Sequence, residues 1–335
     1  MYSRIVNIFV CLVFGLGFSS LFAQNKERDS LLLLLEKEQP KAQEAKILRR
    51  LAELLTESEP ARAGKMALEA LALSEALGDS VEIVQARKAL GNVYWIYNDY
   101  DRSLEYGLSS LQLAEKLKDT KLLSAIYTQL ANNYGDLNYY DKTFEYRLKA
   151  FQIDTMSRNP VQMIPSYINL GDDYRAIKNF EKAIFYTQEA LRLSQEQNLR
   201  PNIGFCLMNL AEIHLDMQQY SKSLEYAEQA YQILKDTEEK IYLLYIITDL
   251  GKIYRLVGRL AESERFLKEG IVLAAKVGSK QVFKEIYHEL AKTHEVHQNY
   301  REALEAFQLA KVYEDSILNE AKVQQIAIAQ AKYDL

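Results

Sequence analysis

The 335-residue chain carries 41 Lys and Arg against 46 Asp and Glu, for a net charge of −5, and no basic tract stands out. Binding to nucleic acid needs a positive surface facing the phosphates, so we expect no nucleic-acid partner. Hydrophobic residues make up 48%, enough for a continuous core, while Gly (13) and Pro (5) are scarce. Scarce helix breakers favour an almost all-helical chain.

The N-terminus differs from the rest of the chain. Arg4 is followed by eighteen residues without a charge, IVNIFVCLVFGLGFSSLF, and then by Ala23 and Gln24. A positive start, an apolar run and a small residue before a polar stretch predict a secretory signal peptide over residues 1–23, and therefore a periplasmic or secreted protein. The alternative is an uncleaved anchor, because eighteen apolar residues can just span a bilayer; this segment would then be the only membrane contact.

Removal of the signal peptide leaves Cys206 as the only cysteine. An intramolecular disulfide is then impossible, even in an oxidising compartment. We expect Cys206 to be a small, buried residue of a helix, and we expect helix packing to supply the stability.

A pattern of forty residues recurs along the chain. Its marker is a leucine, found at Leu90, Leu130, Leu170, Leu210, Leu250 and Leu290, with a shorter copy at Leu51. A fixed period predicts a solenoid that grows one unit at a time. We divide the chain into a lead-in over 24–39, a solenoid over 40–316 and a C-terminal segment over 317–335. The seven repeats are 40–79, 80–119, 120–159, 160–199, 200–239, 240–279 and 280–316.

Each repeat is expected to hold two helices, A and B, joined by a short polar loop. In the first repeat they open at Pro40 and Pro60, because proline suits the first helical turn. The later A helices cover roughly 81–97, 121–137, 161–177, 202–217, 241–257 and 280–297. The later B helices cover roughly 100–117, 140–156, 180–196, 220–236, 260–277 and 300–316. The leucines at 31–35 are expected to cover the first helix pair.

Small and large residues occupy fixed places in the repeat. A small residue follows each marker leucine: Ala52, Gly91, Ala131, Gly171, Ala211, Gly251 and Ala291. Three residues later comes a larger one: Leu55, Tyr94, Tyr134, Tyr174, His214, Tyr254 and His294. The later B helices open with Tyr100, Tyr140, Phe180, Tyr220, Leu260 and Tyr300, with a small residue three later. Large beside small at helical spacing predicts that helices A and B approach closely and interlock.

This alternation resembles the tetratricopeptide repeat, over about residues 41–316 and in register seven times. The resemblance implies an all-α, right-handed superhelical solenoid of about seven helix-turn-helix repeats. Forty residues exceed the usual thirty-four and are similar to the longer-helix repeats of peptide-binding and signalling members. The array also resembles exported repeat arrays of bacterial sensor proteins, although their output modules are absent from this sequence.

The C-terminal segment leaves two structures open. Ile317, Ala321, Ile328, Ala331 and Leu335 fall close to one helical stripe. The helix that they predict either caps the solenoid or begins a coiled coil.

Motifs for chemistry are missing. The sequence holds no G-x-S-x-G, no phosphate-binding glycine loop and no H-E-x-x-H. His288, His294 and His297 lie close in sequence, but His294 takes the place of a packing tyrosine, which makes a metal site the weaker interpretation. We therefore expect neither an enzyme nor a cofactor nor a metal.

The resemblance implies that helix A lines a concave groove that binds a partner. Residues two before, two after and five after the marker leucine would point inward, and they vary from repeat to repeat. The candidate partner-binding residues are Lys88, Asn92, Trp95, Asn132, Asp172, Arg175, Glu212, Lys252, Arg255 and Lys292. Amides there can bond a peptide backbone, and Trp95 is of the kind enriched at binding hot spots.

The family's clamp for a C-terminal carboxylate is matched only in part. Lys88 and Asn92 fit its first pair, but Gln129, Pro165 and Asn169 stand where an asparagine, a lysine and an arginine are needed. We therefore expect a different protein or peptide partner. The function predicted is a non-enzymatic binding scaffold; the alternative is the sensory half of a bacterial signalling protein whose output module is separate. The sequence leaves the oligomeric state open.

Overall fold

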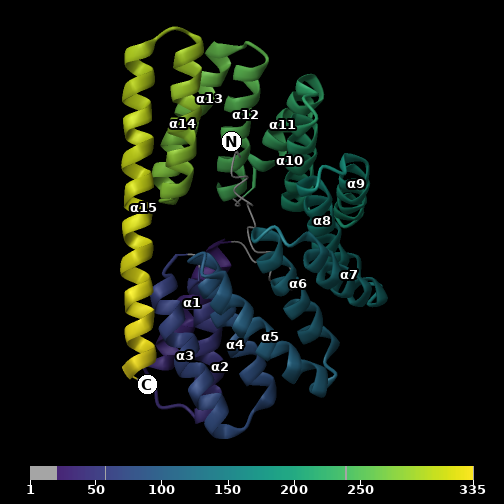
Figure 1. Cartoon of the computed structure of the whole chain (residues 1–335), viewed down its shortest axis with the longest axis vertical. Helices are drawn as coiled ribbons and strands as arrows, with labels where there is room; N and C mark the ends of the chain where they lie inside the picture. The colour runs from purple at the N-terminus through teal and green to yellow at the C-terminus, as the bar shows by residue number, and fades with distance from the viewer. Residues whose placement is uncertain (1–20, 57, 238–239, 335) are drawn as a thin grey trace. The chain divides into compact units, whose positions relative to one another are not determined.

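The computed structural model describes residues 21–56, 58–237 and 240–334. Within these ranges the chain forms helices and no strand, in the order α1 to α15. Figure 1 shows helices that follow one another along the chain running antiparallel as pairs. The prediction of an all-α chain of helix pairs is confirmed.

Helix α1 spans Leu21–Leu35, and the even- and odd-numbered helices after it are the A and B helices of the repeats. The A helices are α2 (Lys41–Leu55), α4 (Ser80–Ile96), α6 (Thr120–Asp136), α8 (Pro160–Ala176), α10 (Arg200–Asp216), α12 (Lys240–Leu256) and α14 (Lys280–Val296). The B helices are α3 (Pro60–Leu77), α5 (Tyr100–Leu117), α7 (Tyr140–Met156), α9 (Phe180–Glu196), α11 (Tyr220–Leu234), α13 (Leu260–Val277) and α15 (Tyr300–Asp334).

The chain divides into two compact units, which we describe separately. Unit 1 contains residues 1–169 and 323–335, and unit 2 contains residues 170–322. The boundary falls within α8, just before the marker leucine Leu170.

The marker leucines form the core of both units. Leu51, Leu90, Leu130, Leu170 and Leu250 are completely buried, and Leu210 is nearly so. The small residue after the marker brings helix B close, because its carbonyl oxygen accepts a hydrogen bond from a B-helix serine. Ser103 Oγ donates to Gly91 at 2.7 Å, and Ser263 Oγ donates to Gly251 at 2.7 Å.

The glycines that directly follow marker leucines have two different kinds of neighbour. A Cβ atom at Gly171 would lie 2.5 Å from Thr187 Oγ1, and one at Gly251 would lie 2.5 Å from Leu267, both on the paired B helix. The close A–B approach predicted for these two positions is confirmed. At Gly91 the atom closest to an added Cβ is Nε2 of Gln129, 2.7 Å away on the following A helix, while Ser103 of the paired B helix bonds the Gly91 carbonyl.

Aromatic rings stack between the two helices of each internal repeat. The ring three residues after the small residue lies against a ring six residues into helix B. These pairs are Tyr94–Tyr106, Tyr134–Tyr146, Tyr174–Tyr186, His214–Tyr226 and Tyr254–Phe266, with centroids 5.3 to 5.7 Å apart. Each such pair contributes about 1 kcal/mol beyond its buried area. The B-helix partners were not recognised in the sequence, although their spacing is regular.

The loops between A and B are left-handed helix caps. Asn98 has φ 57°, and the next amide, of Asp99, donates to the carbonyl of Tyr94 at 2.9 Å. The same arrangement recurs at Gly258, with φ 79°, where the amide of Arg259 donates to the carbonyl of Tyr254 at 2.8 Å. This cap satisfies a carbonyl at the end of helix A and turns the chain within two residues.

The lead-in forms α1, and its leucines Leu31, Leu32, Leu34 and Leu35 pack against the core formed by the first repeat and α4. The expected cover of the first helix pair is present. The predicted cleavage point after Ala23 falls within α1, and residues 1–20 of the predicted signal peptide lie outside the described residues. Among the residues that the structure describes, none of the helices has the length and apolarity needed to cross a bilayer.

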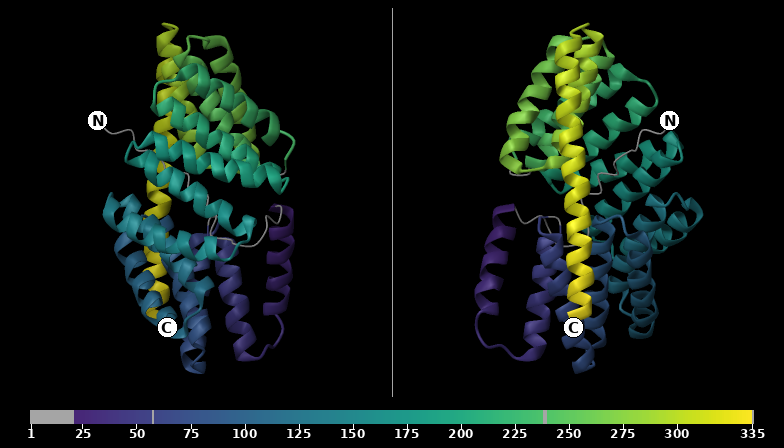
Figure 2. Two further views of the ribbon diagram at one scale, coloured as in Figure 1. Left: turned by 90° about the vertical axis from the view of Figure 1, so that its right-hand side faces the viewer. Right: turned by 60° about the vertical axis from the view of Figure 1, so that its left-hand side comes forward.

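The second helix of repeat seven and the C-terminal segment form one helix. Helix α15 runs without interruption through Tyr300–Asp334, 35 residues, as Figure 2 shows. The boundary expected at residue 317 is therefore not a break in secondary structure.

Candidate functional site

The predicted partner-binding residues all lie on A helices, but in two separate units. Unit 1 contains Lys88, Asn92, Trp95 and Asn132, on α4 and α6. Unit 2 contains Asp172, Arg175, Glu212, Lys252, Arg255 and Lys292, on α8, α10, α12 and α14.

In unit 1 the predicted residues join neighbouring A helices. Nε2 of Gln129 donates to the Lys88 carbonyl at 2.8 Å and to Oδ1 of Asn92 at 2.6 Å. The indole of Trp95 donates to Oδ2 of Asp136 at 2.5 Å. The buried Gln129 and the half-buried Asn92 and Trp95 therefore hold α4 against α6.

Asn132 lies in the packed interior of unit 1. It is 8% exposed, and its Oδ1 accepts a hydrogen bond from Nη2 of Arg147 at 2.7 Å. Arg147 is itself 1% exposed and comes from the paired B helix, α7. The Asn132 amide oxygen therefore binds the buried guanidinium of Arg147, and a role for Asn132 in partner binding stays a prediction.

In unit 2, Arg175 links α8 to α10. It forms an ion pair with Glu212, and its Nε donates to Oδ2 of Asp216 at 2.7 Å. Burial works against the charge of Arg175, but Glu212 and Asp216 hold its pKa above the ordinary value. Beside it, Nδ2 of Asn209 donates to Oδ1 of Asp172 at 3.3 Å.

A second network links α12 to α14. Nη2 of Arg255 lies 2.7 Å from Oε2 of Glu289, and Nζ of Lys292 lies 2.6 Å from Oε1 of the same carboxylate. Burial alone would raise the pKa of Glu289, but the two cations outweigh it and lower the pKa. Glu289 is therefore charged and fully paired.

Asp249 lies between these two networks, and its role was missed in the sequence. It occupies the position just before the marker leucine Leu250. In two other repeats this position carries an amide that bonds the preceding A helix: Gln129 bonds Asn92, and Asn209 bonds Asp172. At Asp249 the nearby group on that helix is another carboxylate, Glu212. Oδ2 of Asp249 is shielded from solvent and has no hydrogen-bond partner among the residues that the structure describes. Burial, and then the charge of Glu212, raise the pKa of Asp249 well above its usual range.

Two further groups complete this region. Burial raises the pKa of Glu285 on α14, although its Oε1 accepts a hydrogen bond from Gln281 at 2.7 Å. The half-buried Lys252 acts electrostatically on Asp249 but forms no ion pair within the described ranges. We call the whole set the A-face of unit 2; it comprises Asp172, Arg175, Glu212, Asp249, Lys252, Arg255, Glu285, Glu289 and Lys292.

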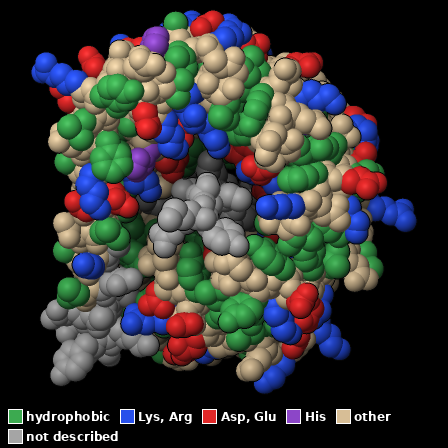
Figure 3. All heavy atoms as spheres, turned by 45° about the horizontal axis from the view of Figure 1, so that its top comes forward, with side chains coloured by type: hydrophobic (Ala, Val, Ile, Leu, Met, Phe, Trp, Pro, Cys, Tyr) green, Lys and Arg blue, Asp and Glu red, His purple; other side chains and the backbone are tan. Residues whose placement is uncertain are grey.

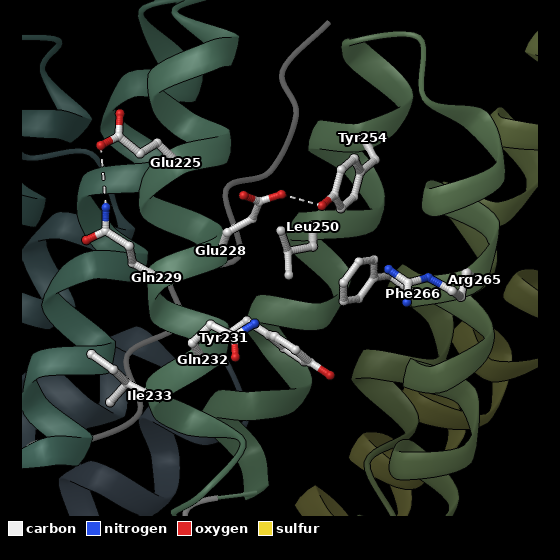
Figure 4. A pocket seen from close by; sticks show the side chains of 10 residues that line it. All are labelled: Glu225, Glu228, Gln229, Tyr231, Gln232, Ile233, Leu250, Tyr254, Arg265 and Phe266. Atoms are coloured by element: carbon white, nitrogen blue, oxygen red, sulfur yellow. Dashed lines mark hydrogen bonds between the residues drawn. The ribbon is translucent and has the colours of Figure 1, made fainter.

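A separate pocket of about 730 Å³ opens between α11 and α13. Figure 4 shows Leu250, Tyr254 and Phe266 on one side and Glu228 on the other. The Tyr254 hydroxyl donates to Oε1 of Glu228 at 2.5 Å, and burial is the main cause that raises its pKa to about 12. Tyr254 lies on the side of α12 opposite Lys252 by helical geometry. This polar pair satisfies itself, so we keep the A-face as the candidate site.

Residues considered for other chemistry have packing roles. The ring of His214 stacks on Tyr226, and Nδ1 lies 2.8 Å from Oε1 of Gln219. Cys206 is completely buried, and burial raises the pKa of its thiol to about 12, which makes it unreactive. Within the described ranges, His, Cys, Asp and Glu side chains form no group of three or more that fits a metal ion.

Charged side chains on the surface are mixed in sign. Figure 3 shows Lys and Arg interspersed with Asp and Glu on the face that it displays. On this face, therefore, charge can guide a partner through local arrangements rather than through a field of one sign.

The helix pairs pack through the buried marker leucines and the stacked aromatic rings. This repeated arrangement defines a helical-repeat protein. Residues 164–197 and residues 205–276 both match family models of the tetratricopeptide repeat. These two segments of the chain therefore consist of tetratricopeptide repeats. A comparison with curated protein sequences finds no match.

Several solved structures share the fold. One is a signal-transduction ATPase with numerous domains and a tetratricopeptide-repeat sensor from Pyrococcus horikoshii; it is 17% identical, with a TM-score of 0.61, over 90% of this chain and 49% of that chain. A Rap protein complexed with competence and sporulation factor is 13% identical, with a TM-score of 0.57, over 92% of this chain and 94% of that one. NprR in complex with its cognate peptide NprX is 15% identical, with a TM-score of 0.59, over 87% and 85%. At such identities the similarity shows the fold.

Proposed function

We propose that the protein is a non-enzymatic scaffold that binds a peptide or a protein segment on the A-face of unit 2. One observation carries this proposal: the A-face contains ionisable groups that the chain's own contacts leave unsatisfied. Oδ2 of Asp249 has no hydrogen-bond partner, and Lys252 has no ion pair within the described ranges. A buried polar atom without a partner costs free energy, which a bound ligand can recover.

The charge arrangement also gives a ligand a direction. Around Glu212, Asp249 and Glu285 the carboxylates outnumber the cations, while Arg255 and Lys292 lie toward the α14 end of the face. A peptide that carries a basic and an acidic side chain would therefore bind in one orientation. The fold neighbours NprR and Rap, whose structures contain a bound peptide or factor, support a binding role for this architecture.

A sensory role is the second candidate. The fold neighbour from Pyrococcus horikoshii is described as having a tetratricopeptide-repeat sensor. In this chain the 35-residue helix α15 continues from the last repeat of unit 2. A rigid helix attached to a ligand-binding array is able to pass a change in the array to another module.

Selection from a phage-displayed random peptide library tests the binding role. We expect the wild-type protein to enrich peptides with a shared charged motif. The variant Asp249→Asn with Lys252→Met keeps side-chain size but removes both charges, and should fail to enrich that motif. A matched control, Lys222→Met with Asp236→Asn, changes exposed residues of unit 2 outside the A-face and should enrich it as the wild type does. Equal enrichment by all three proteins would rule out the A-face.

We also propose that the chain is exported and that residues 1–23 are removed. The sequence from Arg4 to Ala23 supports this through its basic start and its apolar run. Expression of the full chain in a bacterium, followed by N-terminal sequencing of the periplasmic and secreted fractions, should give a chain that begins at Gln24. A chain retained in the membrane with Met1 intact would instead indicate an anchor.

A further inference from the structure

Helix α15 exposes a face that the B helices of internal repeats bury. On α11 the first, fifth and eighth residues are Tyr220, Leu224 and Ala227; the first two are half-buried and Ala227 is completely buried. The equivalent residues of α15 are Tyr300, Leu304 and Phe307, which are 68%, 58% and 53% exposed. This face keeps the apolar character of a repeat-stacking surface and is largely exposed, apart from an edge contact between Phe307 and His288 of α14.

The exposed face continues as a mixed stripe. At 100° per residue, Lys311, Glu314 and Leu318 follow Phe307 on the same side of the helix. Leu318 is 53% exposed. The side chains of Lys311 and Glu314 are 55% and 45% exposed, and they form an ion pair at 2.9 Å within the helix, on its surface, where a second copy can reach both charges. We call Tyr300, Leu304, Phe307, Lys311, Glu314 and Leu318 the α15 stripe.

We propose that the α15 stripe is a homodimer interface, in which α15 of a second copy packs antiparallel against it. The stripe is self-complementary in this orientation. Around a two-fold axis between Val312 and Tyr313, Phe307 faces Leu318 of the second copy, and Lys311 faces Glu314 of the second copy. Because the interface is isologous, each of these contacts occurs twice.

Charge complementarity favours this arrangement over a parallel pair. In parallel, in-register helices each Lys311 would face Lys311, and each Glu314 would face Glu314, which is repulsive. The antiparallel pair instead forms two ion pairs in the middle of the contact, with an apolar contact at each end. Helix–helix interfaces commonly combine apolar and charged positions in this way. It also restores the helix cover that every internal B helix receives from its neighbour.

The oligomeric state of the purified chain tests this interface directly. Analytical ultracentrifugation between about 1 and 100 μM should show a dimer, since this range brackets ordinary homodimer affinities. Leu304→Glu with Phe307→Glu should raise the dimer Kd by about a hundredfold or more, because it places four carboxylates in the contact. The control Phe185→Glu, at a 56% exposed phenylalanine of α9, should leave the dimer intact. Circular dichroism checks that all variants remain helical.

A charge exchange tests the antiparallel register. Lys311→Glu should weaken the dimer about tenfold by facing Glu314 of the second copy with another carboxylate. Adding Glu314→Lys to that variant exchanges the two charges and should restore wild-type affinity. A monomeric wild-type chain, or a charge-exchanged variant that is no tighter than Lys311→Glu, would overturn the proposal.

Discussion

Replacement of Gly251 with valine is expected to lower the free energy of unfolding by about 3 kcal/mol. A Cβ atom at this position would lie 2.5 Å from both Cγ and Cδ2 of Leu267, a side chain with no exposed surface. Close-packed interiors have no room into which such a side chain can move. Urea unfolding, followed by circular dichroism, measures the change.

Gly135 provides a control at a position that has room for a Cβ atom. It also lies in an A helix, α6, but an added Cβ atom would meet Thr143 at 3.7 Å, an ordinary contact. Gly135→Ala should therefore stabilise the protein by roughly 0.5–1 kcal/mol, since alanine is the better helix former. Equal changes in the free energy of unfolding for the Gly251 and Gly135 substitutions would contradict this account. They would show that helix propensity, and not contact between helices A and B, decides the effect of replacing Gly251.

Replacement of Asp249 with asparagine is expected to stabilise the protein at neutral pH, by more than the roughly 0.5 kcal/mol of ordinary surface changes. The pKa of Asp249 is raised by burial and by Glu212. A carboxyl group whose pKa is higher in the folded than in the unfolded chain destabilises the fold as pH rises above the unfolded pKa, which is about 3.9. The advantage of the variant should therefore grow from about pH 4 toward neutrality.

The pH dependence separates this electrostatic effect from a change in packing. Arg175 and Lys252 lower the pKa of Asp249, whereas Glu212 and Glu285 raise it, so the comparison must include all four groups. Denaturant midpoints at pH 4 and pH 7 give the required difference. Asp315→Asn, at an exposed aspartate of α15, should change stability little at either pH. An Asp249→Asn variant that is less stable than the wild type at pH 7 would contradict this reading of Asp249.

Regular spacing made the repeat framework readable from the sequence. The marker leucine, the small residue after it and the ring three residues further recur every forty residues, so their helical faces follow from periodicity alone. The left-handed caps follow from polar pairs such as Asn98-Asp99. The second ring of each stack, such as Tyr106, is equally regular, but its partner on helix A depends on how the two helices pack.

The candidate site was less predictable, because its residues depend on contacts between helices. Asn132 looked like a groove residue by position, but Arg147 on the paired helix engages it. Asp249 occupies the same place in the repeat as Gln129 and Asn209, and only the neighbouring Glu212 makes it distinctive. Neither outcome follows from the spacing within one helix, since each is decided by which side chain the neighbouring helix presents.

Isothermal titration calorimetry tests the central claim most directly, by measuring the affinity of a peptide selected on the wild-type protein. If the A-face of unit 2 is the binding site, Asp249→Asn with Lys252→Met should raise the Kd by about tenfold or more. The control Lys222→Met with Asp236→Asn should leave the Kd unchanged. Binding of equal strength to all three proteins would contradict the assignment of function to this face.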